Sequence, residues 1–145
     1  MERALDEARA AAARGEVPVG AVVTRDGAVI AAAGNRTRER NDPTAHAEIL
    51  AIRMACEALG SERLTGCDLH VTLEPCPMCA GAISFARIRR LYFGAEDPKG
   101  GAVVSGARLY DLPTCHHAPD VYPGIAESES AALLKDFFRT LRIPI

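Results

Sequence analysis

Two short motifs in the chain combine metal-binding residue types with one acidic residue. His46-Ala47-Glu48 is the first, and Pro75-Cys76-Pro77-Met78-Cys79 is the second. Two cysteines at positions i and i+3 of a first helical turn point the same way, and a helix N-terminus stabilises the thiolate form that binds metal. One nitrogen and two sulfur ligands leave a fourth position open for water, as in catalytic zinc sites. We therefore predict one Zn²⁺ per chain, held by His46, Cys76 and Cys79.

The number of ligands matters, because structural zinc sites are closed by four protein ligands. Cys56 cannot be the fourth, since it lies about 15 Å from His46 along the axis of one expected helix. Cys67 precedes an expected strand rather than a helix start. One alternative stays open, in which a loop of unpredictable structure closes the site or binds a second metal ion through Cys115, His116 and His117.

The presence of Glu48 indicates a catalytic site, since an acidic residue two positions from a ligand has no role in a structural zinc site. Residues at i and i+2 do not share a face inside a helix, so His46 and Glu48 serve one site only if it lies off the first helical turn. There the carboxylate can take a proton from zinc-bound water and pass it to a leaving group. For Glu48 taken alone, the alternative is an exposed helix glutamate.

The helices and strands that must position these motifs follow from hydrophobic periodicity and turn residues. A hairpin turns at Asp26-Gly27, and strands then alternate with helices. This order predicts an α/β fold with three layers, α-β-α, and a mixed central sheet of about five strands. Segment 97–126 is the least predictable. The expected helices are 2–14, 43–59 after an N-cap at Asp42, 75–86 and 128–141, and the expected strands are 17–24, 28–34, 69–73 and 90–94.

The composition fits one globular domain over residues 1–145, with 48% hydrophobic and 25% charged residues. No apolar run approaches the roughly 18 residues of a membrane helix, which excludes membrane proteins as well as disordered and fibrous chains. Five cysteines without a signal-peptide pattern indicate a cytoplasmic protein. The formal net charge is −2, so nucleic-acid binding would need a local basic patch, with Arg36, Arg38, Arg40, Arg87, Arg89, Arg90 and Lys99 as candidates.

The spacing H-x-E followed by P-C-x-x-C is the signature of zinc-dependent nucleobase deaminases. The chain resembles the cytidine deaminase-like superfamily, and most closely the bacterial tRNA-specific adenosine deaminases. The resemblance runs nearly end to end, although the stretch 104–122 departs from it. Its motifs are Glu16-Val17-Pro18-Val19-Gly20-Ala21, Gly34-Asn35-Arg36, Asp42-Pro43-Thr44-Ala45-His46-Ala47-Glu48, Val71-Thr72-Leu73-Glu74-Pro75-Cys76, Cys79-Ala80-Gly81-Ala82, Phe93-Gly94-Ala95, Asp97-Pro98-Lys99-Gly100 and Asp136-Phe137-Phe138-Arg139.

This resemblance implies that a single zinc-dependent deaminase domain converts the wobble adenosine of a tRNA anticodon loop to inosine and releases ammonia. It implies zinc ligation by His46, Cys76 and Cys79, attack on the purine by zinc-bound hydroxide, and proton transfer by Glu48. A tRNA anticodon stem-loop as partner and a homodimer are implied as well. The substrate contacts that it implies are Asn35, the backbone amides near Ala47 and Cys76, and Glu16, Val17, Asp97, Lys99, Phe137, Phe138 and Arg139.

Other interpretations of the same residues stay open. A guanine deaminase or another free-nucleobase deaminase shares the zinc motifs, although Asp97-Pro98-Lys99-Gly100 and Phe137-Phe138-Arg139 favour the tRNA enzyme. A non-catalytic zinc-containing subunit that binds RNA or a partner is an alternative of a different class, and an intact Glu48 argues against it. Phe137 and Phe138 could also form the apolar face of a packed helix, and Asn35 could be a turn residue.

Overall fold

The computed structural model describes residues 1–141, so the last four residues of the predicted 1–145 domain lie outside the described part. Within residues 1–141, no helix is long and apolar enough to cross a membrane. In chain order the elements are α1 (Glu2–Ala13), β1 (Gly20–Arg25), β2 (Ala28–Gly34), α2 (Thr37–Arg40), α3 (Ala47–Leu59), β3 (Cys67–Leu73), α4 (Pro77–Phe85), β4 (Arg90–Ala95), the 3-10 helix η1 (Leu109–Asp111), β5 (Asp120–Tyr122) and α5 (Glu127–Leu141).

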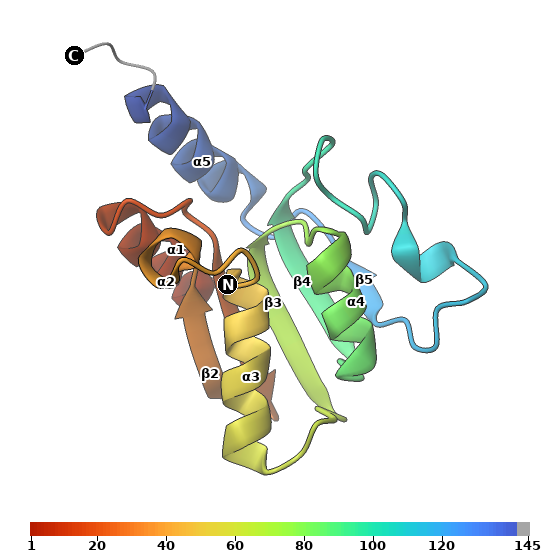
Figure 1. The fold of residues 1–145 in the computed structure, drawn as a ribbon. Helices are drawn as coiled ribbons and strands as arrows, with labels where there is room; N and C mark the ends of the chain where they lie inside the picture. Colours follow the sequence, from red (N-terminus) through yellow and green to blue (C-terminus); the bar gives the residue numbers. More distant parts are fainter. Residues whose placement is uncertain (142–145) are drawn as a thin grey trace.

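A five-stranded sheet in the order β2-β1-β3-β4-β5 forms the middle layer. Strand β1 pairs antiparallel with β2 and with β3, whereas β3, β4 and β5 run parallel. Helices α3 and α4 lie side by side over one face of the sheet, and α1 and α5 pack on the other (Figure 1). This arrangement confirms the predicted three-layer α/β fold with a mixed sheet.

The core follows from the two-residue period of the central strands. In β3 the side chains of Leu69 and Val71 are fully buried, and in β4 so are those of Leu91 and Phe93. They belong to one apolar cluster to which α3 and α4 also contribute, Ile83 of α4 among them. This cluster, which is apolar apart from the thiol of Cys67, holds α3 and α4 against the sheet.

Helix α1 lies unusually close to β1, where Gly20 is the strand residue that permits the approach. A Cβ built on Gly20 would collide with the backbone carbonyl of Ala4 and would lie 2.7 Å from the backbone nitrogen of Ala8. The helix in turn presents small buried residues, Ala4, Ala8 and Ala11, to the sheet. This contact fixes the segment between α1 and β1, which contains Glu16 and Val17.

The predicted helix start at Asp42-Pro43, which corresponds to the start of α3, is wrong. The Oδ1 atom of Asp42 accepts hydrogen bonds from the backbone N–H of Thr44 at 2.8 Å and from its hydroxyl at 2.7 Å. Such a bond from an aspartate to the backbone two residues on stabilises a turn in place of a helical turn. The helix therefore begins at Ala47, with His46 as its N-cap.

Further elements differ from the prediction: the short helices α2 and η1 were not expected, and β3 begins at Cys67 rather than at position 69. Strand β1 begins at Gly20 rather than at position 17, because a turn in which the Val19 N–H donates to the Val17 carbonyl precedes it. The fifth strand, β5, comes from the segment that the sequence left without assignment. It has only three residues, which is too short for an alternating pattern to identify.

Three aromatic rings stack across the parallel strands at positions that pair in register. His70 of β3 stacks on Tyr92 of β4 with ring centroids 4.7 Å apart, and Tyr92 stacks on Tyr122 of β5 at 5.0 Å. The Nε2 atom of His70 lies 3.2 Å from the Thr24 hydroxyl. Burial, and after it the positive N-terminus, lowers the pKa of His70 below its ordinary value near 6.5.

We expect His70 to make folding stability depend on pH. Because the folded state favours neutral imidazole, its contribution is complete above the unfolded pKa near 6.5 and is lost as pH falls from there through the lower folded pKa. Denaturant unfolding at about pH 7.5 and about pH 5.5 should therefore show a larger loss for the wild type than for His70→Phe, which keeps a ring in the stack. Equal losses in the two proteins would contradict this expectation.

Candidate active site

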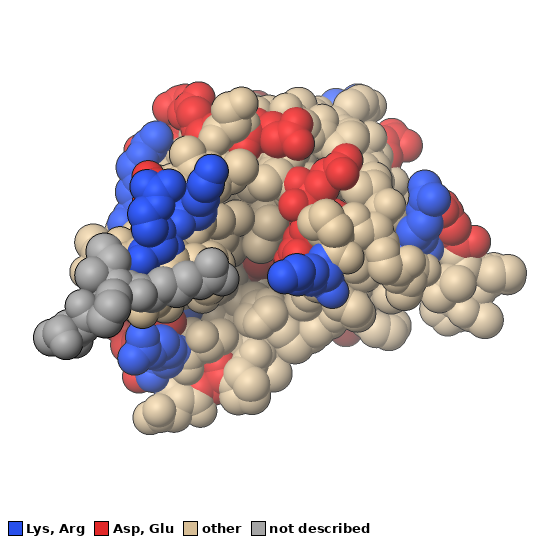
Figure 2. Space-filling model, turned by 90° about the horizontal axis from the view of Figure 1, so that it is seen from above, with Lys and Arg blue, Asp and Glu red and all other residues tan. Residues whose placement is uncertain are grey.

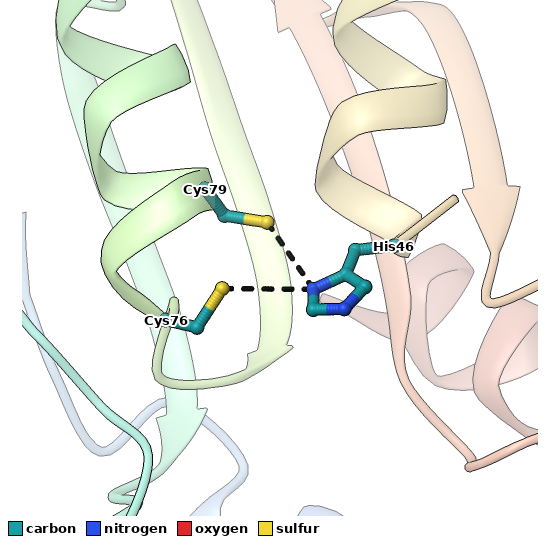
Figure 3. Close-up of side chains that lie close together, drawn as sticks. All are labelled: His46, Cys76 and Cys79. Atoms are coloured by element: carbon teal, nitrogen blue, oxygen red, sulfur yellow. Dashed lines mark hydrogen bonds between the residues drawn. The ribbon is translucent and has the colours of Figure 1, made fainter. Parts of the chain in front are cut away.

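The three predicted metal ligands meet where α3 and α4 begin. His46 is the N-cap of α3, Cys76 is the N-cap of α4, and Cys79 lies in the first turn of α4. The Nδ1 atom of His46 is 3.6 Å from Sγ of Cys76 and 3.5 Å from Sγ of Cys79. Figure 3 shows the two thiols on α4 facing the imidazole across the gap between the helix starts. Both helix N-termini thus point their positive ends at the thiols.

The spacing of these donor atoms fits zinc. Tetrahedral bonds of about 2.3 Å to sulfur and about 2.05 Å to nitrogen place such atoms about 3.6 Å apart. All three ligand atoms lie within 4.8 Å of one another, and residues 1–141 contain no second group of this kind. One imidazole and two thiols match the ligand set of a catalytic zinc site, which has three protein ligands and keeps a fourth position for water.

The thiols of this group are electrostatically unlike one another. Hydrogen bonding from the Cys79 thiol, opposed by burial and aided by His46, lowers the pKa of Cys76 to about 4. The same contact and deeper burial raise the pKa of Cys79. The neighbouring thiolate of Cys76 raises the pKa of His46, against the effect of burial. The lowered pKa of Cys76 favours its thiolate, the form in which a cysteine binds metal.

Glu48 is buried next to the ligand group, in the first turn of α3. Its side chain is only 4% exposed. Burial raises the pKa of Glu48 to about 7, while the charge on His46 opposes the rise. A carboxyl group with a pKa near 7 takes up and releases protons at neutral pH, which is what general acid–base catalysis requires.

A cleft of about 290 Å³ opens onto this group. Figure 2, viewed from above, shows a hollow near the middle of this face, with basic side chains on both sides of it and acidic side chains beside it. The volume is near the lower end of the range for small-molecule sites. The lining residues come from one end of the sheet, where β1 begins and β2, β3 and β4 end, and from the helix starts and loops beside it. They are Val17, Val19, Asn35, Thr37, His46, Glu48, Leu73, Glu74, Cys76, Asp97 and Gly100.

Asn35 connects the end of β2 with the start of α3. Its Oδ1 atom accepts a hydrogen bond of 2.9 Å from the backbone N–H of Ala47, the first residue of the helix. The sequence predicted that the backbone amide near Ala47 contacts the purine. Since this N–H already donates to Asn35, a purine would have to share or displace that hydrogen bond. Asn35 also lines the cleft, and its Nδ2 atom donates no hydrogen bond to another residue within 1–141. The amide nitrogen is therefore a free donor at the wall of the cleft.

A second groove of about 480 Å³ continues the cleft toward α5. The two share Val17, Leu73 and Asp97, and the groove adds Lys99 and Phe138. Its lining is largely apolar, and its charged residues are Lys99 and the acidic Glu96 and Asp97. Of the residues that the sequence predicted for substrate contact, Val17, Asp97, Lys99 and Phe138 lie along this continuous surface.

The structure does not bring the remaining predicted contacts to the cleft. Glu16 is 2% exposed, and its carboxylate accepts hydrogen bonds from the backbone N–H groups of Arg38 at 3.1 Å and Glu39 at 2.8 Å, which caps α2. Phe137 packs edge-on against Phe138 with ring centroids 5.4 Å apart. Arg139 is exposed on the last turns of α5 and pairs with Asp136 at 3.6 Å.

The loop with Cys115, His116 and His117 does not join the metal ligands. The Sγ atom of Cys115 lies 3.6 Å from the Ser84 hydroxyl on α4 and 3.2 Å from the His117 carbonyl. Nε2 of His117 lies 2.7 Å from the carbonyl of Ile88. These contacts attach the loop to the far end of α4, so the alternative of a fourth ligand from this loop is wrong for the described structure.

Sequence reasoning missed Glu74, a cleft residue directly before the cysteine motif. It assigned no role to this acid, although Glu74 stands in the motif Leu73-Glu74-Pro75-Cys76. A carboxylate in an otherwise apolar run at the end of a buried strand was the available signal, because such a charge is buried only with partners.

The fold and the site together define a hydrolytic deaminase of nucleobases. The family model of MafB19-like deaminases matches residues 1–142, and the chain belongs to this family. The tRNA-specific adenosine deaminase of Agrobacterium fabrum is 72% identical over 143 residues, which cover 99% of this chain and 94% of that protein.

Two solved structures extend the comparison. A chain from studies of A-to-I editing by tRNA:A34 deaminases at the wobble position of transfer RNA matches with a TM-score of 0.91 and 74% identity, covering 92% of this chain and 97% of its own. A guanine deaminase from Nitrosomonas europaea matches with a TM-score of 0.81 but only 27% identity, over 94% of this chain and 81% of its own. The free-base enzyme thus shares the fold at much lower sequence similarity.

Proposed function

We propose that this protein deaminates the wobble adenosine of a tRNA anticodon loop to inosine, using one zinc ion bound by His46, Cys76 and Cys79. The observation that carries the proposal is that these three ligand atoms lie together at a cleft that His46, Cys76 and the buried Glu48 line. The high identity to a tRNA-specific adenosine deaminase supports the choice of substrate.

The residues of the cleft divide the reaction between them. When bound, zinc supplies a nucleophile at neutral pH by acidifying water. Glu48 takes up a proton at its carboxylate and delivers it to the exocyclic amino nitrogen of adenine, which leaves as ammonia. Its pKa of about 7 suits both steps. Nδ2 of Asn35 donates to an acceptor atom of the purine and so holds the ring against Glu48.

The groove beside the cleft supports an RNA substrate. A base must leave its stack to enter a deaminase pocket. In an anticodon loop, few base pairs are broken when one base flips out. Phe138 offers an aromatic face to a neighbouring base, and Lys99 offers a cation to a phosphate. Val17, Asp97, Phe137 and Arg139 remain proposed contacts of the same RNA, while Glu16 acts through the backbone of α2.

Inosine formation in an anticodon stem-loop with a wobble adenosine tests the proposal, with free guanine assayed in parallel. We expect product from the RNA and none from guanine. Ammonia from guanine with unchanged RNA would identify a free-base deaminase with the same zinc chemistry. Zinc-loaded protein that binds the RNA but converts neither substrate would point to a non-catalytic subunit.

The proposed homodimer is tested by light scattering, with twice the chain mass expected.

We expect Asn35→Asp to separate the two roles of Asn35. Aspartate keeps an oxygen for the N–H of Ala47, so the start of α3 stays capped, but it removes the Nδ2 donor. kcat/KM for the stem-loop should fall by about tenfold to a hundredfold, which corresponds to about 1–3 kcal/mol for one lost polar contact. The melting temperature should stay near that of the wild type. Wild-type kcat/KM in this variant would exclude the purine contact.

A further inference from the structure

Glu74 is a buried carboxylate for which the proposed chemistry has no use. It follows the last residue of β3 and is 2% exposed. Within residues 1–141, none of the ion pairs involves it. Burial of an unpaired charge is costly unless hydrogen bonds satisfy it. The hydrogen-bond donors to the Glu74 carboxylate therefore show which segment this side chain stabilises.

Five hydrogen bonds from one loop converge on this carboxylate. Its Oε2 atom accepts the backbone N–H groups of Val103, Val104 and Ser105, each at 3.0 Å. Its Oε1 atom accepts the N–H of Asp97 at 2.9 Å and the Ser105 hydroxyl at 2.9 Å. Three successive N–H groups that point at one oxygen form an anion-binding nest. The side chain of Glu74 thus occupies the place that a bound anion takes in other proteins.

The loop is built closely around the carboxylate. A Cβ on Gly101 would collide with Cδ of Glu74 and would lie 2.6 Å from the carbonyl oxygen of Asp97. The N–H of Ala102 donates to the carbonyl of Pro75 at 2.9 Å, so the loop is also bonded to the residue after Glu74. Segment 97–105 is therefore bonded both to the carboxylate of Glu74 and to the backbone of the next residue, Pro75.

The same segment forms part of the substrate surface. Asp97 and Gly100 line the cleft, and Lys99 lines the adjoining groove. The chain that Glu74 begins continues through Pro75 to Cys76, one of the three ligand-type residues. One carboxylate thereby sets the distance between the loop with Lys99 and the start of α4.

We propose that Glu74 is a positioning residue for the deamination of RNA, which holds segment 97–105 in register with the metal ligands through its five hydrogen bonds. This inference rests on the proposed function. Glu74 touches neither the reacting atoms nor, in this proposal, the RNA. Its effect reaches the substrate through Asp97 and Lys99, so its loss should weaken RNA binding more than the chemical step.

Glu74→Gln is the first variant to test, because it keeps the shape and replaces one accepting oxygen with an NH₂ group. We expect KM for the stem-loop to rise by about tenfold or more, with a smaller change in kcat, since misplaced positioning groups have effects of this size. Zinc content should stay at one ion per chain. Ser105→Ala, which removes only the hydroxyl bond, should shift KM in the same direction but less, and it serves if Glu74→Gln fails to fold.

Leu64→Ala is the matched control for lost stability. Leu64 is fully buried, and it bonds through its N–H to Ala86 at the opposite end of α4 from the metal ligands. We expect this variant to melt at a lower temperature yet to keep the wild-type KM. Amide hydrogen exchange adds a direct readout: the N–H groups of Val103, Val104 and Ser105 should exchange faster in Glu74→Gln and at the wild-type rate in Leu64→Ala.

Each outcome decides the matter. An unchanged KM in Glu74→Gln, with activity lost only in proportion to unfolded protein, would overturn the positioning role. Unchanged exchange at Val103 to Ser105 would overturn the hold on the loop. A wild-type protein that forms no inosine would overturn the proposed function instead, and the exchange rates would still decide whether Glu74 holds segment 97–105.

Discussion

Glu48→Gln should lower kcat for inosine formation by about 10²- to 10⁴-fold, the usual contribution of a positioned acid–base group. Glutamine fills the same buried space at the start of α3, but its amide cannot take up a proton. The residues that could hold the metal are His46, Cys76 and Cys79, and Glu48 is not among them. The variant should therefore bind zinc as the wild type does.

Glu57→Gln is the matched control, because it makes the same chemical change at an exposed position on the same helix. Its kcat should equal that of the wild type. Metal analysis and single-turnover kinetics on the stem-loop provide the measurements. If Glu48→Gln turned over at the wild-type rate with zinc bound, the proton transfer assigned to Glu48 would be wrong.

Removal of the metal should abolish deamination while the fold persists. The three ligand atoms come from the starts of two helices, whereas the core of Leu69, Val71, Leu91 and Phe93 is wholly apolar. Chelation should thus leave the far-ultraviolet circular dichroism unchanged, and added Zn²⁺ should restore activity. Cys79→Ala should reproduce the loss without recovery, since a methyl group cannot coordinate zinc.

Cys56→Ala provides the control for cysteine replacement. Cys56 lies near the end of α3 and is not part of the ligand group. Its zinc content and turnover should match the wild type. Turnover that persists in zinc-free protein would contradict the metal-dependent reaction, and a chain that unfolds on chelation would instead indicate a structural metal.

The sequence predicted the ligand group because each motif is local. A cysteine pair at i and i+3 needs only one helical turn to bring its thiols together, and β3 needs only its two-residue period to be identified as a strand. The expected meeting of His46 with this pair depended on both motifs standing at helix starts and on the resemblance to zinc deaminases, and the structure places Nδ1 of His46 3.5 and 3.6 Å from the two sulfur atoms. The sequence thus predicted the architecture, and the structure brings the three predicted ligand residues together.

The features that escaped prediction depend on contacts between distant segments. Asp42 fits a helix N-cap and a turn equally well, and the hydrogen bonds to Thr44 select the turn. Strand β5 has three residues, so its pairing with β4, rather than its own pattern, makes it a strand. The partners of Glu74 are mostly backbone N–H groups, which every residue type except proline possesses, so no residue pattern marks them.

The long segment between β4 and α5 is held to the rest of the fold at several points but not along its whole length. Glu74 holds its first part, the Tyr110 hydroxyl donates to the Ala80 carbonyl at 2.9 Å, and β5 returns the chain to the sheet. Between η1 and Cys115 the residues are exposed. Insertions are best tolerated at exposed tips between anchored ends. A short peptide tag placed between Leu112 and Thr114 would therefore label the enzyme without displacing its catalytic cleft.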